Sequence, residues 1–273
     1  MKKKTLVPGL MAAAALVFCG TAHAQQVYRA YDLTATPVGS PTPVTPAPRG
    51  PGSLVTGFEP SEGFLVGPVG GQMGWTTFNA STTEGHVDAL NPMGGSQHLR
   101  IDHDPASPNG TSIGAFSPNL GALPVGPSSL TVDVAISAAG GADYDIVVQA
   151  PSQGFLSARV KFSWQGHILV LDNPGTGLSF VDTGVTWNVG TYTNLTINID
   201  PVANTIDYSY GGTPIYSGVA GVFAGTTMEQ VVLFSDNWNL TDVGDFDNVS
   251  MVPEPATLAM LGLGGLCLVR RRR

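Results

Sequence analysis

The fold is decided by Leu195-Thr196-Ile197-Asn198-Ile199-Asp200, which a turn at Ala203-Asn204 joins to Ile206-Asp207-Tyr208-Ser209-Tyr210. Apolar and polar residues alternate in both stretches, so every second side chain can face a core while its neighbours face water. Two such runs separated by a short polar turn are typical of an antiparallel β-hairpin. The pattern therefore predicts strands rather than helices.

Alternation of the same kind recurs from residue 54 to residue 251. Further strands are predicted at residues 132–136, 146–148, 160–164, 168–171, 231–234 and 246–249, with Gly, Pro, Asn and Asp between them. Outside the two termini, no window shows the 3.6-residue period of an amphipathic helix. Many short strands in one span of about 200 residues predict a single all-β sandwich or barrel with antiparallel sheets.

The hairpin and the residues before it resemble part of the concanavalin A-like jelly roll, the fold of lectins and laminin-G modules. The resemblance rests on Trp187, on Gly190-Thr191-Tyr192 leading into the first strand, and on Gly211-Gly212 ending the second. It implies a two-sheet antiparallel jelly-roll sandwich over residues 54–251. Short hydrophobic sorting helices are expected to flank this domain at the N- and C-terminus.

Charge is sparse and unevenly distributed. Charged residues make up 12% of the 273-residue chain, about half the usual fraction, and the formal net charge is −8. Only five of the twelve basic residues lie within residues 25–252, together with nineteen of the twenty acidic residues. Such a domain repels polyanions and attracts cations such as calcium, which excludes nucleic acid as a partner. Both cysteines, Cys19 and Cys267, lie near the termini, so no disulfide is expected within the domain.

The first 24 residues have the pattern of a secretory signal peptide. Lys2 to Lys4 form its basic start, residues 10–18 form its apolar run, and Ala22-His23-Ala24 is a small-x-small cleavage site for signal peptidase. Residues 25–53 follow as a linker with six prolines between Pro37 and Pro51. This proline spacing favours an extended spacer.

Residues 252–273 form a tail of three parts. Pro253-Glu254-Pro255 comes first, an apolar segment over residues 256–269 follows, and Arg270, Arg271, Arg272 and Arg273 end the chain. The apolar segment is short for a permanent anchor, and the arginines favour the cytoplasmic side. This order resembles the PEP-CTERM sorting signal of Gram-negative bacteria that make extracellular polysaccharide. The resemblance implies recognition by an exosortase, a membrane transpeptidase; an ordinary single-pass anchor is the alternative.

A calcium site is predicted where the two ends of the domain meet. Glu59 lies near its start and Asp245 and Asp247 lie near its end, and the first and last strands of jelly rolls often pair. Gly57-Phe58-Glu59, with Gly74-Trp75 and Asp247-Asn248 further on, resembles calcium-bearing glycan-binding modules. Calcium takes about six to eight oxygen ligands, of which these carboxylates would supply a part. The alternative is solvated acidic residues at strand ends.

A sugar-binding loop is predicted at Asp236-Asn237-Trp238-Asn239. An aromatic ring can stack on the apolar face of a pyranose while Asn and Asp bind its hydroxyl groups. Loops of a rigid sandwich are common binding sites. The alternative is that Trp238 packs against the edge of the core.

Two further patterns argue against metal binding and catalysis. His98, Arg100, Asp102 and Asp104 alternate with Leu99 and Ile101, which predicts a solvated strand face. A retaining glycosidase needs two carboxylates about 5 Å apart, and the Glu-x-Asp-x-x-Glu strand of related glycosidases does not occur in this sequence. The sequence therefore predicts a protein that is not an enzyme.

Together these features predict an exported, non-catalytic surface or matrix protein of a Gram-negative-type bacterium. It would be anchored transiently at the inner membrane, sorted by an exosortase-like system, and in contact with extracellular polysaccharide. Structural calcium is a further expectation. Two alternatives stay open, namely a purely architectural matrix protein without a specific ligand and a divergent glycan hydrolase or lyase.

Overall fold

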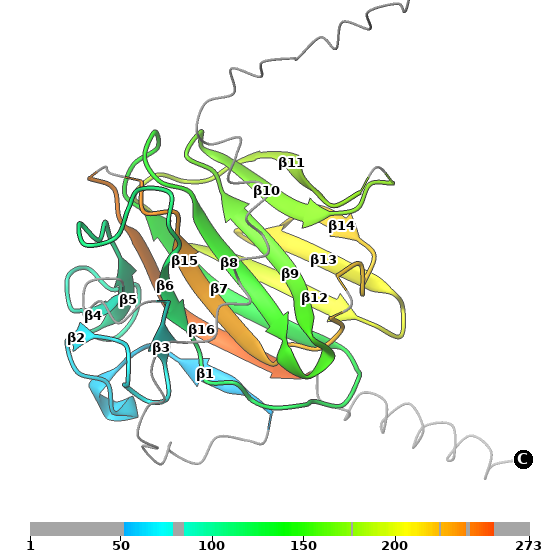
Figure 1. The fold of residues 1–273 in the computed structure, drawn as a ribbon, viewed down its shortest axis with the longest axis horizontal. Helices are drawn as coiled ribbons and strands as arrows, with labels where there is room; N and C mark the ends of the chain where they lie inside the picture. The colour runs from blue at the N-terminus through cyan, green and yellow to red at the C-terminus, as the bar shows by residue number, and fades with distance from the viewer. Residues whose placement is uncertain (1–51, 79–84, 176, 224, 239–240, 254–273) are drawn as a thin grey trace, which may run out of the picture. The chain divides into compact units, whose positions relative to one another are not determined.

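The computed structural model describes residues 52–253, apart from residues 79–84, 176, 224 and 239–240. Its strands form two antiparallel sheets, named here sheet A and sheet B, which pack face to face (Figure 1). Two single turns of 3-10 helix, η2 (Pro60–Glu62) and η3 (Pro151–Gln153), are the helical elements of the described part. The predicted all-β, two-sheet jelly-roll sandwich is confirmed.

Sheet A contains nine strands of the described chain. The C-terminal strand, β16 (Gly244–Pro253), lies near the middle of this sheet. The spatial order of the strands is β14 (Thr213–Gly218), β13 (Thr205–Tyr210), β12 (Thr193–Asp200), β7 (Ser128–Ile136), β16, β5 (His98–Ile101), β4 (His86–Asp88) and β2 (Gly67–Pro68), with β1 (Leu54–Thr56) also beside β16.

Sheet B contains seven strands of the described chain. Their spatial order is β11 (Ser179–Thr186), β10 (His167–Asp172), β9 (Phe155–Phe162), β8 (Tyr144–Ala150), β15 (Gln230–Ser235), β6 (Ile113–Phe116) and β3 (Thr76–Thr77). The edge strands β11 and β14 were not predicted, because their side chains alternate between half-buried and exposed positions and lack a continuous apolar face.

The core between the sheets follows the alternation seen in the sequence. Leu195, Ile197 and Ile199 of β12 are buried, and Leu195 pairs with Val132 of β7 across the sheet. From sheet B, the inward side chains of β8, β9 and β15 complete this core; they include Ile146, Val148, Val160, Phe162, Val231 and Leu233. Burial of apolar surface stabilises such a sandwich by roughly 25 cal/mol per Å².

The first and last described strands pair, as predicted. Strand β1 lies antiparallel to the second half of β16, and Leu54 stands opposite Met251. The first half of β16 pairs with β5 on the same side, while β7 runs along the other side. The register with β7 shifts between Asp247 and Ser250, so a β-bulge lies where the neighbour of β16 changes from β5 to β1.

The two termini fall outside the described residues. This applies to the predicted signal peptide with Ala22 and Ala24, to most of the proline-rich linker, and to both predicted hydrophobic helices. Within the described part, no helix is long and apolar enough to cross a membrane.

Candidate functional site

Of the predicted calcium ligands, Asp247 lies at the bulge in β16, and Glu59 lies between β1 and η2. Glu59 accepts hydrogen bonds from the backbone N–H of Ser96 at 2.8 Å and of Gln97 at 3.1 Å. Asp247 Oδ2 accepts two more, from Met93 and Gly94, each at 3.0 Å. The two carboxylates therefore hold the loop over residues 93–97 between them.

A glycine is required inside this loop. Gly95 has a φ of +64°, and a Cβ there would lie 2.1 Å from Oε1 of Glu59. Close to the same point, Phe58 has a φ of +59° and Asn248 a φ of +49°, both uncommon for residues other than glycine. The centroid of the Phe58 ring lies 5.1 Å from that of Trp75, so the first two of the three segments in the glycan-module resemblance are in contact.

Asp245 does not join the other two predicted ligands. Its carboxylate accepts hydrogen bonds from Arg100, with Oδ1 2.8 Å from Nε and Oδ2 3.1 Å from Nη2. Arg100 also reaches Asp88, at 2.7 Å. Asp245 therefore belongs to an ion-pair network with Arg100 and Asp88, apart from the loop contacts of Glu59 and Asp247.

The oxygen atoms near the bulge fit calcium only in part. They include carboxylates, as calcium requires, but N–H donors already occupy both oxygens of Asp247, since Oδ1 accepts from the N–H of Asn248. Among the residues that the structure describes, no group of three or more His, Cys, Asp or Glu side chains could hold a metal ion. In the described residues, the carboxylates of Glu59 and Asp247 thus anchor the loop over residues 93–97.

His98 is buried, contrary to the predicted solvated strand face. Its ring is fully covered, and its Nδ1 hydrogen-bonds the hydroxyl of Tyr192, which precedes β12. Burial lowers the pKa of His98, the nearby carboxylate of Asp245 opposes this shift, and Arg100 adds to it. The prediction was wrong for His98 because the side chain of Tyr192 covers it. Leu99 and Ile101 point into the core, as expected.

The predicted sugar-binding loop has a largely structural arrangement. Asn237 is buried, its Oδ1 accepts a hydrogen bond from the N–H of Asp104, and its Nδ2 donates to the carbonyls of Asp104 and Ser107. Trp238 is half-buried and packs against the core, which is the alternative considered for it. Asn239 lies outside the described residues. The prediction is therefore corrected for Asp236 and Asn237, whose side chains face inward.

Asp236 is the carboxyl group of this loop whose pKa is shifted. Only 6% of the residue is exposed, and its Oδ1 accepts a hydrogen bond from the N–H of Asp143 while Oδ2 meets no hydrogen-bond partner among the described residues. Burial and the charge of Asp143 raise the pKa of Asp236 to about 7, although Lys161 opposes the shift. The group holds a proton up to neutral pH.

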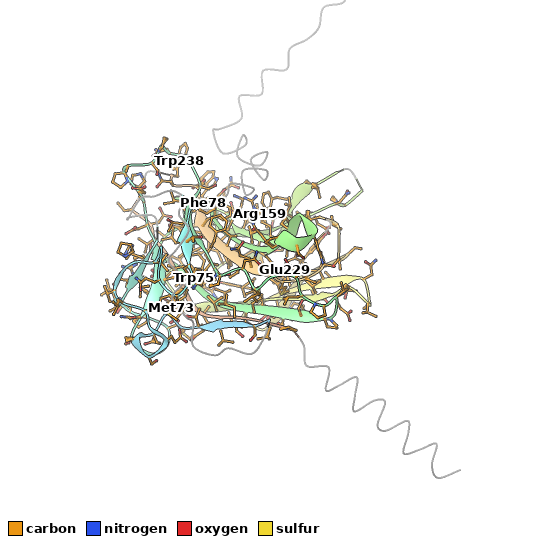
Figure 2. The ribbon with its side chains drawn as sticks, turned by 60° about the horizontal axis from the view of Figure 1, so that its bottom comes forward. Met73, Trp75, Phe78, Arg159, Glu229 and Trp238 are labelled. Atoms are coloured by element: carbon orange, nitrogen blue, oxygen red, sulfur yellow. The ribbon has the colours of Figure 1, made fainter. Side chains whose placement is uncertain are left out.

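A charged cluster occupies the face of sheet B that is turned away from sheet A. Arg159 Nε lies 2.6 Å from Asp145 Oδ1, and Lys161 Nζ lies 2.8 Å from Asp143 and 3.1 Å from Asp145. Burial alone would raise the pKa of Asp145, but the charges of Arg159 and Lys161 outweigh burial and lower it. Figure 2 shows Arg159 between Trp238 and Glu229, which flank the two ends of β15.

Aromatic rings frame these two cations. The Arg159 guanidinium lies 5.1 Å from the ring centroid of Phe180 and 5.3 Å from that of Phe234, and Lys161 Nζ lies 5.2 Å from Phe180. At the edge of the sheet, His167 and Asp182 stand 3.0 Å apart with side chains 42% and 50% exposed. We call Arg159, Lys161, His167, Phe180 and Asp182 the β9–β11 patch.

Sequence reasoning missed this patch, although a signal for it exists. Asp143 and Asp145 are two residues apart, as are Arg159 and Lys161, and both pairs lie in or next to adjacent predicted strands. Opposite charges with the period of a strand stand on one face and can pair across the ladder. Phe180 could not be found in this way, because β11 was not predicted.

Comparison with solved structures finds matches of low sequence identity. A sialidase aligns with a TM-score of 0.49 and 10% identity, over 67% of this chain and 17% of the sialidase. A Bacillus licheniformis beta-glucanase aligns at 0.46 and 12%, over 76% and 100%. The carbohydrate-binding module CBM66 from Bacillus subtilis aligns at 0.37 and 12%, over 64% and 93%. These matches assign neither ligand nor activity to this chain.

No curated protein matches this sequence. The C-terminal tail, however, is similar to a family model described as the PEP-CTERM protein-sorting motif, over residues 252–273. Of these residues, Val252 and Pro253 are described and end β16, whereas Glu254, Pro255 and Arg270 to Arg273 lie outside the described residues. The chain therefore carries a PEP-CTERM protein-sorting motif at its C-terminus.

Proposed function

We propose that this is an exported, non-catalytic surface or matrix protein that an exosortase-type transpeptidase sorts and whose sandwich contacts extracellular polysaccharide. The observation that carries the proposal is the sorting motif over residues 252–273, which begins within the last strand of an all-β domain. Signal peptidase and the transpeptidase would act during export. The final location would be the cell surface or the matrix around it.

The β9–β11 patch supports the polysaccharide contact. Sugar sites combine apolar or aromatic surface with a few polar groups that fix orientation. Here the half-buried Phe180 ring lies beside two cations, and His167 and Asp182 extend the polar surface to the exposed edge. The imidazole of His167 and the carboxylate of Asp182 can exchange hydrogen bonds with hydroxyl groups, while the buried Lys161 stays paired with Asp143 and Asp145.

The glutamates of the described part support a role without catalysis. Glu59 binds the loop over residues 93–97, Glu62 accepts from the N–H of Gly57, and Glu229 accepts from the N–H of Ser152 at 2.8 Å. Each carboxylate is thus engaged in holding a loop. A glycosidase would instead present a pair of carboxylates to its substrate.

Binding of residues 52–253 to a panel of neutral and acidic polysaccharides tests the proposal. We expect saturable binding to one class, reduced at least about tenfold by Phe180→Ala, a loss of roughly 1.4 kcal/mol. Leu178→Ala is the matched control, because Leu178 is an exposed apolar residue next to β11. Loss of binding in Trp238→Ala alone would assign the contact to the Asp236–Trp238 loop instead.

The same titration in calcium and in chelator tests the calcium expectation, which would require Glu59 and Asp247. Absence of binding to the whole panel in both buffers would overturn the polysaccharide contact and leave an architectural matrix protein.

A second candidate function, a divergent glycan hydrolase or lyase, is favoured by one observation. Asp143 and Asp145 share Lys161, and Asp236, with a pKa raised by burial to about 7, lies near them. We expect no product from any bound polysaccharide on prolonged incubation. Release of reducing ends or unsaturated sugars that is lost in Asp236→Asn would contradict the non-catalytic role.

A further inference from the structure

The sorting motif and the folded domain share residues. The motif covers residues 252–273, while β16 ends at Pro253. Val252 stands opposite Ser129 and Pro253 opposite Ser128 of β7. No linker therefore separates the sheet from the first residues of the sorting motif.

The strength of the pairing changes at Met251. Up to this residue, β16 is paired on both sides: Met251 stands opposite Leu54 of β1 and opposite Leu130 of β7, and it is 1% exposed. In the described residues, the ladder with β1 extends to Met251, while the ladder with β7 continues to Pro253. Proline lacks an N–H, and Pro253 is exposed, so the last two residues are held weakly.

An enzyme that binds a peptide in extended form needs the backbone hydrogen-bonding groups of that peptide to be free. Residues paired in a sheet must first leave it by local unfolding. At this chain end, release of Val252 and Pro253 breaks their pairing with β7, whereas release of Met251 would also break the ladder with β1 and expose a core side chain.

We propose that the folded sandwich controls access to its own sorting motif: Val252 and Pro253 must leave β7 before the transpeptidase can bind, and Met251 limits how far the strand opens. This inference rests on the proposed sorting function. It makes the rate of tail removal depend on the end of β16 as well as on the motif.

The test uses the full-length chain in a bacterium that has an exosortase, with loss of the C-terminal tail followed by pulse-chase. A Gly-Ser-Gly-Ser insertion between Met251 and Val252 keeps residues 252–273 intact but frees them from β7. We expect processing to become about fivefold faster, the factor that corresponds to roughly 1 kcal/mol for one backbone hydrogen bond. Met251→Ala, which loosens the two-sided pairing, should also accelerate processing.

The matched control is the same insertion after Gly212, which lies in the turn between β13 and β14, where a Cβ meets open space and which is separated from β16 by β12 and β7. It should leave the rate unchanged. An unchanged rate with the insertion at Met251 would overturn the access inference while leaving sorting intact. If the wild type and Glu254→Ala kept their tails equally, the sorting function itself would be wrong, and the inference with it.

Discussion

Asp236 shows how one buried residue can make the stability of the domain depend on pH. Its pKa is raised from 3.8 to about 7, first by burial and then by Asp143, so the folded state binds a proton that the unfolded chain releases. The stability that this proton supplies is complete below about pH 4 and is lost as pH rises to about 7.

We therefore expect the free energy of unfolding to fall by up to about 1 kcal/mol per pH unit between pH 5 and pH 7 because of this residue. Asp236→Asn, which mimics the protonated acid, should remove that slope in urea titrations at several pH values. Asp207→Asn, at an exposed carboxylate, is the control and should retain it. Equal slopes in wild type and Asp236→Asn would contradict the assignment.

Gly114 allows the backbones of β6 and β15 to approach each other closely. Its φ is +146°, and a Cβ at this position would lie 2.2 Å from the carbonyl oxygen of Leu233 in β15. Gly114→Ala should therefore separate β6 from β15 and lower the free energy of unfolding by about 3 kcal/mol or more. Gly126→Ala, where a Cβ meets open space, should change it by less than about 0.5 kcal/mol. Thermal unfolding of the two variants provides the comparison.

At the scale of elements, β8 and β9 are joined by buried ion pairs as well as by their ladder. Removing one member of a buried pair leaves an uncompensated charge, so Arg159→Met should cost about 3–5 kcal/mol through Asp145. Because Lys161 also contacts Asp143, the double variant Arg159→Met/Asp145→Leu leaves an intact pair and should recover most of that loss. A double-mutant cycle from denaturant unfolding measures the coupling; additive losses would contradict the pairing.

For the whole molecule, we expect the folded domain to require β16, which is paired with β7, β5 and β1. A chain that ends at Pro253 keeps all of β16 and should unfold within about 2 °C of the full chain, or less than about 1 kcal/mol. A chain that ends at Phe246 loses Val249 and Met251, both buried, together with the pairing to β1. We expect that shorter chain to show no cooperative transition in calorimetry.

Much of the fold could be predicted because the determinants are local. Alternation at Leu195, Ile197 and Ile199 reflects a strand with one buried face, and the turn at Ala203-Asn204 fixes its partner. The pairing of the first and last strands was also predicted correctly. Edge strands such as β11 escaped prediction, because a strand without a buried face has no apolar period to detect.

The candidate site was harder to predict because contacts between distant residues determine it. Glu59 and Asp247 were expected to meet, and both bind the loop over residues 93–97, but Asp245 pairs with Arg100. Burial reversed the expectations for His98 and Asn237, since exposure depends on which segment lies across a face.

The sequence by itself determined the strand pattern, the acidic character of the domain and the three-part sorting tail, because each depends on residue type and spacing along the chain. Only the tertiary structure decided that β16 lies in the middle of sheet A and that Val252 and Pro253 belong to both the sheet and the motif. It alone also placed Phe180 over Arg159 and Lys161. The physical reason is that the order of strands in a sheet arises from packing of distant segments, which no local period encodes.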